Sequence, residues 1–181
     1  AGPRAEVIIA NPAGIQINGG GFINASKATL TTGLPIVNQG QIDTYRIQGG
    51  SITVDGIGLD LRTTDYAAIL ARAVQVNAGI WANNLTVITG TNAIDASTLS
   101  ANQTVSISPV EGTNSTPVMA LDIAQLGGMY AGKIFLWGTE AGLGVRNTGV
   151  MSTHTDNLVI QNNGALSNTG TIQSKGDLEI H

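Results

Sequence analysis

Residues 147–160 read NTGVMSTHTDNLVI and residues 168–180 read NTGTIQSKGDLEI, so the last part of the chain repeats itself. The Asn-Thr-Gly starts of the two copies are 21 residues apart and their Leu-x-Ile ends are 20 apart, because the first copy holds one extra residue. A fixed period near 20 residues indicates stacked, similar turns of chain. At about 3.3 Å per strand residue, each turn holds about three short strands with corners between them. The repeat therefore predicts the rungs of a parallel β-helix.

Apolar and polar residues alternate within the repeat, as they do in strands that bury one face. Asn-x-Gly triplets at the corners suit the tight turns between such strands. A single rung cannot bury its apolar side alone, so the rungs must stack. We therefore predict an all-β fold, a right-handed parallel β-helix. The residues expected to point inward are Leu158, Ile160, Leu166, Ile172, Leu178 and Ile180.

Four upstream segments show the same strand pattern less regularly. They are residues 50–56, 85–90, 105–108 and 133–138. Residues 92–117, which include the segment 105–108, are rich in Ser, Thr, Asn and Pro. Such a composition predicts a hairpin or an excursion outside the body of the β-helix.

Residues 65–76 form the one segment whose apolar spacing also fits a short helix. Thr63 or Thr64 could cap the start of that helix. The last part of the segment, Val74-Gln-Val76, reads equally well as a strand. The sequence alone leaves both interpretations open.

The opening segment AEVIIANPAGI, at residues 5–15, is expected to form a strand, a turn and a second strand. The continuous apolar run at 7–9 is typical of a strand that is covered on both faces and lies inside the fold. Asn11, Pro12 and Gly14 stand where these residue types are preferred in a type I turn. The chain is expected to reverse there and to resume as a strand.

The composition limits the class of protein. The 181 residues are enough for one domain with a substantial core, so we expect residues 1–181 to form a single domain. Charged residues make up 11 % of the chain and hydrophobic residues 42 %, which argues against disorder. The net charge of −4 disfavours nucleic-acid binding, which needs a basic patch. The chain contains no cysteine, so it has no disulfide, thiolate metal site or cysteine nucleophile.

Catalytic chemistry finds little support in the sequence. His154 is the sole internal histidine and His181 ends the chain, so neither a catalytic triad nor a zinc site is indicated. Asp55, Asp60 and Asp65 are spaced by five residues, but the glycines around them do not follow a calcium-loop pattern. We therefore expect no enzyme activity, no metal site and no cofactor.

Residues 11–15 read NPAGI, and residues 21–33, 65–81 and 126–144 extend the same family pattern along the chain. Together they resemble the secretion domain of the two-partner secretion exoproteins of Gram-negative bacteria. This family includes filamentous haemagglutinin and the contact-dependent growth-inhibition effectors, and Asn-Pro-x-Gly-Ile is its marker motif. The resemblance covers most of the chain.

The resemblance implies the amino-terminal secretion domain of a large exported adhesin or toxin-delivery protein. Such a protein reaches the cell surface or the medium through the periplasm. Its implied partner is an outer-membrane β-barrel transporter, whose periplasmic domains recognise the exported chain. The domain is then expected to nucleate β-helix folding at the cell surface. A receptor on a host or neighbouring cell is a further partner, which the full-length protein would contact.

Two alternatives stay open at this point. Asn11, Pro12, Ala13, Gly14 and Ile15 form either a recognition element for the transporter or a turn that serves folding alone. The chain itself is either a secretion domain or, as the alternative, a segment that binds a host surface or a carbohydrate directly. The carbohydrate alternative needs a groove with clustered carboxylates and aromatic residues, and the two Trp and three Tyr are not clustered along the sequence.

The resemblance also bears on the boundaries of the domain. The family's domain normally carries further strands, a capping segment and an Asn-Pro-Asn-Leu motif before Asn-Pro-x-Gly-Ile. We therefore expect a partial two-partner secretion domain that lacks its amino-terminal cap. Residues 147–181 are expected to begin a series of haemagglutinin-type repeats of about 20 residues.

Overall fold

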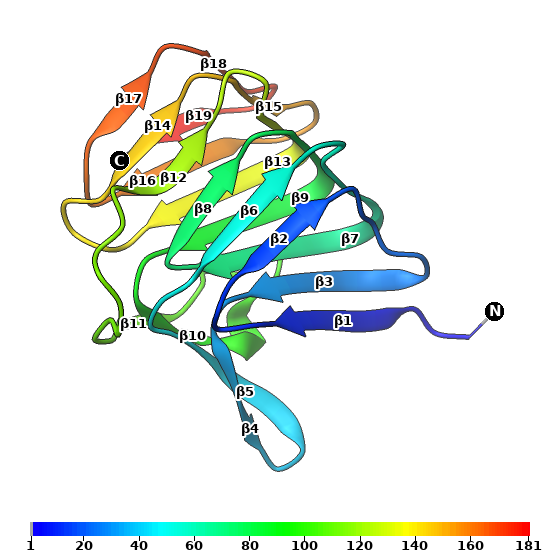
Figure 1. Cartoon of the computed structure of the whole chain (residues 1–181). Helices are drawn as coiled ribbons and strands as arrows, with labels where there is room; N and C mark the ends of the chain where they lie inside the picture. Colours follow the sequence, from blue (N-terminus) through cyan, green and yellow to red (C-terminus); the bar gives the residue numbers. More distant parts are fainter. Residues whose placement is uncertain (1) are drawn as a thin grey trace.

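Strands that are far apart in the sequence lie side by side and run in the same direction, so the chain winds as the predicted parallel β-helix (Figure 1). The computed structural model describes residues 2–181. Its largest sheet has nine strands: β1 (Ala5–Ala10), β3 (Ala25–Thr31), β7 (Leu59–Ala71), β9 (Gly79–Thr89), β13 (Gly128–Gly138), β15 (Val150–Thr153), β16 (Leu158–Asn162), β18 (Thr171–Gln173) and β19 (Leu178–Ile180). The long strands β7, β9 and β13 bend, and therefore run along two faces of the helix in succession.

A second parallel sheet forms the remaining face. Its six strands are β2 (Ile15–Asn18), β6 (Ser51–Asp55), β8 (Ala73–Val76), β12 (Met119–Ile123), β14 (Gly144–Asn147) and β17 (Leu166–Asn168). Each strand pairs in parallel with the corresponding strand of the next rung. The chain thus passes from face to face around each rung.

The carboxyl-terminal repeat is in register, as its spacing predicts. Asn147 lies opposite Asn168, and Leu158 lies opposite Leu178. The extra residue of the first copy is taken up in the turn at 154–157, where the second copy has three residues at 175–177. Because the difference falls in a turn, the strands on either side of it stay aligned.

The interior of the β-helix is a single apolar stack. Leu158 and Ile160 are fully buried in it, and Leu166 and Ile172 are partly buried against it. The final strand differs from the prediction, since Leu178 and Ile180 are 46 % and 49 % exposed. They cover one side of the stack below them and have no further strand above them among the described residues.

The predicted excursion is confirmed. Residues 92–117 leave the body of the helix and contain β10 (Asn92–Asp95), the short 3-10 helix η1 (Ala96–Thr98) and β11 (Ile107–Pro109). Strands β10 and β11 join an antiparallel sheet with β4 (Leu34–Asn38) and β5 (Gln41–Ile47), a hairpin that the sequence analysis missed. In Figure 1 this hairpin projects away from the helix.

The short helix considered for residues 65–76 is wrong, because this segment forms the second half of β7 and all of β8. Inward residues of β7, such as Ile69, pack into the main core, whereas outward ones, such as Leu70, pack under the excursion. A strand that is buried on both faces has a continuous apolar run, which periodicity alone cannot distinguish from a helix. Thr64 caps no helix; its hydroxyl donates to the Leu61 carbonyl at 2.7 Å.

The expected interior position of residues 7–9 is also wrong. Strand β1 pairs only with β3 among the described strands, so it is an edge strand. Ile8 and Ile9 are 37 % and 44 % exposed. The apolar run thus marks the first rung of the stack and not a strand covered on both sides.

Arg72 fastens the excursion to the body of the helix. Its guanidinium is nearly buried and forms two hydrogen bonds with the Glu140 carboxylate, at 2.8 and 3.1 Å. It also donates to the carbonyl of Asn114, in the excursion, at 2.7 Å. The hydrogen bonds that Arg72 donates to Glu140 raise the pKa of Arg72, so the buried guanidinium stays charged and depends on its partner.

Glu140→Gln is expected to destabilise the protein by about 3 kcal/mol, because it leaves the Arg72 charge buried without a counter-charge. Urea unfolding of the whole chain measures this change. Glu111→Gln is the matched control, since Glu111 is an exposed residue of the excursion whose carboxylate forms no ion pair within residues 2–181. It should change the free energy of unfolding by less than about 0.5 kcal/mol. Equal effects of the two substitutions would contradict the role assigned to the ion pair.

Candidate functional site

The segment Asn11–Ile15 forms the predicted turn. The backbone N–H of Gly14 donates to the Asn11 carbonyl at 3.0 Å, which closes the turn. The Asn11 side chain accepts a bond from the Ala13 N–H at 3.1 Å, an arrangement that mimics a further turn of backbone. The Asn11 side chain is therefore engaged in shaping its own turn.

The turn differs in one respect from the prediction. It does not fold β1 back on β2, since the two strands lie in different sheets. It forms the corner at which the first rung passes from one face of the β-helix to the next. The Asn11 N–H donates to the Thr31 carbonyl at the end of β3, at 3.0 Å, so this corner is tied to the rung above.

The base of the β4–β5 hairpin packs against the same turn. The hairpin leaves the helix after Thr31 and returns at Gly50, directly above Pro12. Gly50 has a φ of +78°, and a Cβ at this position would lie 2.6 Å from the Pro12 carbonyl oxygen and 2.9 Å from Thr32 Cβ. Only glycine fits this conformation without strain. The turn and the hairpin thus form one continuous surface.

The five motif residues divide into two groups by exposure. Ile15 packs partly against the main core, and Gly14 faces the Ser51 carbonyl. Pro12 and Ala13 are exposed, and their side chains form no hydrogen bond, as expected for their chemistry. Asn11 is exposed as well, so a partner that binds at this corner contacts Pro12 and Ala13 together with the Asn11 side chain that shapes the turn.

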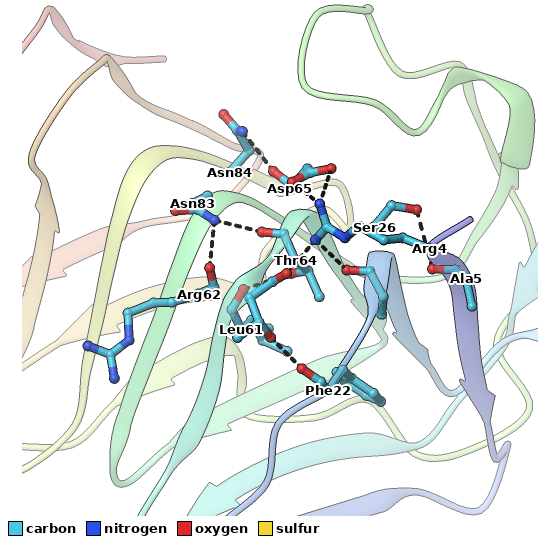
Figure 2. A network of polar contacts seen from close by, with 12 residues as sticks. Arg4, Ala5, Phe22, Ser26, Leu61, Arg62, Thr64, Asp65, Asn83 and Asn84 are labelled. Carbon is cyan, nitrogen blue, oxygen red and sulfur yellow. Dashed lines mark hydrogen bonds and ion pairs between the residues drawn. The ribbon is translucent and has the colours of Figure 1, made fainter. Parts of the chain in front are cut away.

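A polar network holds the first three rungs together at another corner (Figure 2). Arg4 forms an ion pair with Asp65 at 2.8 Å and donates to the Ala25 carbonyl at 2.7 Å. Asn83 donates to the carbonyls of Arg62 and Thr64, at 2.8 and 2.7 Å. At this corner four residues of β7 lie opposite one residue of β9, so some backbone carbonyls have no partner in the neighbouring strand. The side chains of Arg4 and Asn83 donate hydrogen bonds to such carbonyls.

The three regularly spaced aspartates do not come together. Asp65 pairs with Arg4, and Asp55 accepts bonds from Gln16 and Asn77. These two amides lower the pKa of Asp55, with Asn77 the stronger influence. Within residues 2–181, no cluster of His, Asp and Glu is arranged to hold a metal ion.

Asp60 is held ionised by its neighbour. Hydrogen bonds from Arg62 lower the pKa of Asp60 to about 2. A lowered pKa favours the folded state above the unfolded value near 4, and this contribution is lost as the pH falls towards about 2. Both side chains are about half exposed, so the contribution is small.

Sequence reasoning missed a group of aromatic residues. Tyr66 lies on β7, whereas Phe135 and Trp137 lie two rungs further along on β13, yet all three line one cavity of about 390 Å³ beside the excursion. These residues point outward from strands that pair in register. Their proximity can be recognised only after the rungs are aligned with one another. No helix within residues 2–181 has the length and apolar character needed to cross a membrane.

Comparison with known proteins gives consistent matches. A family model described as TPS secretion domain matches residues 1–168. The chain is 48 % identical over 181 residues to a protein named Toxin CdiA from Yersinia pestis. It is 42 % identical over 170 residues to tRNA nuclease CdiA-2 from Burkholderia pseudomallei (strain 1026b). These alignments cover 100 % and 93 % of this chain but only 5 % of each relative, so the chain spans a small part of their length.

A solved structure has the same fold. The crystal structure of filamentous hemagglutinin secretion domain matches with a TM-score of 0.73 and 28 % identity. The match covers 99 % of this chain and 65 % of that chain. The β-helix and its winding are therefore shared with a solved secretion domain.

Gly50→Ala is expected to destabilise the protein by more than about 3 kcal/mol, because it adds a steric clash with the turn to the cost of a positive φ. Gly40→Ala is the matched control. Gly40 has a similar φ of +80°, but a Cβ there meets nothing within 4 Å, so the cost should be about 1 kcal/mol. Thermal and urea unfolding would measure both values. Similar costs at the two positions would show that the hairpin base does not pack against the turn.

Proposed function

Because the chain belongs to the TPS secretion domain family, we propose that it is captured in the periplasm by the periplasmic domains of a cognate outer-membrane transporter. The family supports this partner, since its members are secretion domains of large proteins that Gram-negative bacteria export. The fold is that of a secretion module and not of a catalytic one. The nuclease and toxin names belong to the relatives, and we assign no catalytic role to this chain.

The surface proposed for capture is the corner formed by the Asn11–Ile15 turn and the β4–β5 hairpin. Its supporting observation is the exposure of Pro12 and Ala13 on a turn whose conformation Asn11 fixes. The adjoining strand β4 exposes Leu34, Ile36 and Val37, which are 53 %, 43 % and 62 % accessible. Neighbouring exposed apolar side chains on a protruding hairpin are typical of an interaction site.

Folding outside the cell is the second part of the proposal. Each rung pairs in parallel with the one before it, so a formed rung serves as a template for the next. We propose that residues 147–181 begin a longer series of such rungs, because their two copies already stack in register. Growth of the stack at the cell surface would prevent the exported chain from slipping back. The full-length protein would then act as an adhesin or in toxin delivery, at a host or neighbouring-cell receptor.

The capture surface is tested by Ala13→Arg. A large charged side chain at this exposed position should weaken binding to the purified periplasmic domains at least about tenfold, without unfolding the chain. Asn11→Ala would be less informative, because the Asn11 side chain also shapes the turn. Titration calorimetry measures the affinity, and circular dichroism checks the fold.

Ala141→Arg is the matched control for this experiment. Ala141 is exposed in a turn between β13 and β14, at the same corner of a later rung, which the Leu143 N–H closes on the Glu140 carbonyl. This variant should bind like the unmodified chain. Equal affinities of both variants, or no binding by the unmodified chain, would overturn the proposal.

A further inference from the structure

A cavity of about 390 Å³ lies between the outer face of the nine-stranded sheet and the loop of the excursion. This volume is within the range of small-molecule sites in proteins. Leu85 and Val105 form part of its apolar lining. Phe135 and Trp137 add two aromatic rings, which meet edge to face with centroids 6.1 Å apart. The cavity belongs neither to the turn nor to the hairpin discussed above.

Tyr66 lines this cavity with its side chain, and its hydroxyl oxygen is buried. The residue is 7 % exposed, and its hydroxyl forms no well-aligned hydrogen bond among residues 2–181. Burial raises the pKa of Tyr66 to about 12, although the Thr86 side chain lies close enough to lower this pKa slightly, so the phenol is neutral and able to donate or accept. A buried hydroxyl without a partner is destabilising, and native proteins rarely tolerate one without a reason.

Further polar groups around the cavity are also uncommitted. Gln103 and Gln161 line it, and their amides form no hydrogen bond within the described residues. Asn84 uses its amide nitrogen on the Asp65 carbonyl, which leaves its oxygen as an acceptor. Lys133 donates to the Ala101 carbonyl at 3.3 Å and retains further N–H groups. The cavity thus offers both donors and acceptors around an aromatic floor.

We propose that this cavity binds a saccharide ring. The C–H face of a sugar fits against Phe135 and Trp137, while its hydroxyls, which donate and accept, match the free amides at the rim. On binding, the side chains that cover the Tyr66 hydroxyl would shift, so that the phenol pairs with a sugar hydroxyl. Among residues 2–181 no carboxylate lines the cavity, so a cationic ligand lacks a counter-charge there. This site acts independently of transporter capture, and either proposal can fail alone.

The two tryptophans provide an internal comparison for testing the site. Trp137 lines the cavity, whereas Trp81 lies outside it and stacks on Tyr130 at 6.2 Å. Methyl β-glucoside, methyl β-galactoside and N-acetylglucosamine, each added well above a millimolar Kd, should shift the indole N–H resonance of Trp137 in a saturable way. The Trp81 resonance should not move. No shift with any of these sugars would overturn the proposal, as would a Trp137 shift with the peptide Gly-Phe-Gly alone.

Tyr66→Phe separates binding from stability. It removes only the unpaired hydroxyl, so the chain should be as stable as before or more so, whereas the sugar affinity should fall about tenfold. Tyr130→Phe, outside the cavity, should leave the affinity unchanged. A purely structural Tyr66 would give the same affinity in all three chains, which would contradict the site.

Discussion

The parallel register between successive rungs is the constraint on which this fold depends. Main-chain hydrogen bonds align equivalent positions of every rung, so inward residues from all rungs meet in one stack. An insertion within a strand would break this alignment, and the chain places its irregular segments at corners instead. The β4–β5 hairpin and the 92–117 excursion both leave between a strand of the large sheet and a strand of the six-stranded sheet. Rungs can therefore be added along the axis of the helix without disturbing the segments that project from its surface.

The same arrangement explains how surface features arise. Outward residues of neighbouring rungs fall in columns, and a corner of one rung lies above the corner of the rung before it. The turn at Asn11–Gly14 therefore adjoins the hairpin base at Gly50, although the two are far apart in the sequence. Likewise, the cavity brings Tyr66 of β7 together with Phe135 and Trp137 of β13, two rungs away. Both candidate sites depend on the register and not on any local motif alone.

Much of the fold could be predicted, because the period of the 20-residue repeat equals the length of a rung. The turns could be predicted too, because their conformation depends on the residues within them. The hairpin escaped notice because its two-residue turn is Gln39-Gly40, both at positive φ, where Asn-Gly is the usual signal. Residues 65–76 were ambiguous because a tertiary feature, the excursion, covers the outer face of β7. The cavity was invisible for the same reason. A sequence pattern describes one rung at a time. Burial of the outer face of β7 depends instead on the excursion, which is inserted elsewhere in the chain.

The buried pairing of Arg72 with Glu140 also has a consequence for the order of folding. The two residues are 68 positions apart, and the Arg72 contacts in the excursion lie between them in the sequence. When the chain is delivered from one end, the guanidinium and its counter-charge arrive at different times. Whichever comes first must stay hydrated until the other appears, because burying it alone is unfavourable. We therefore expect the early rungs to stack beforehand and the excursion to close only once both residues are present. Because of this ion pair, closure of the excursion depends on the emergence of the chain as far as Glu140.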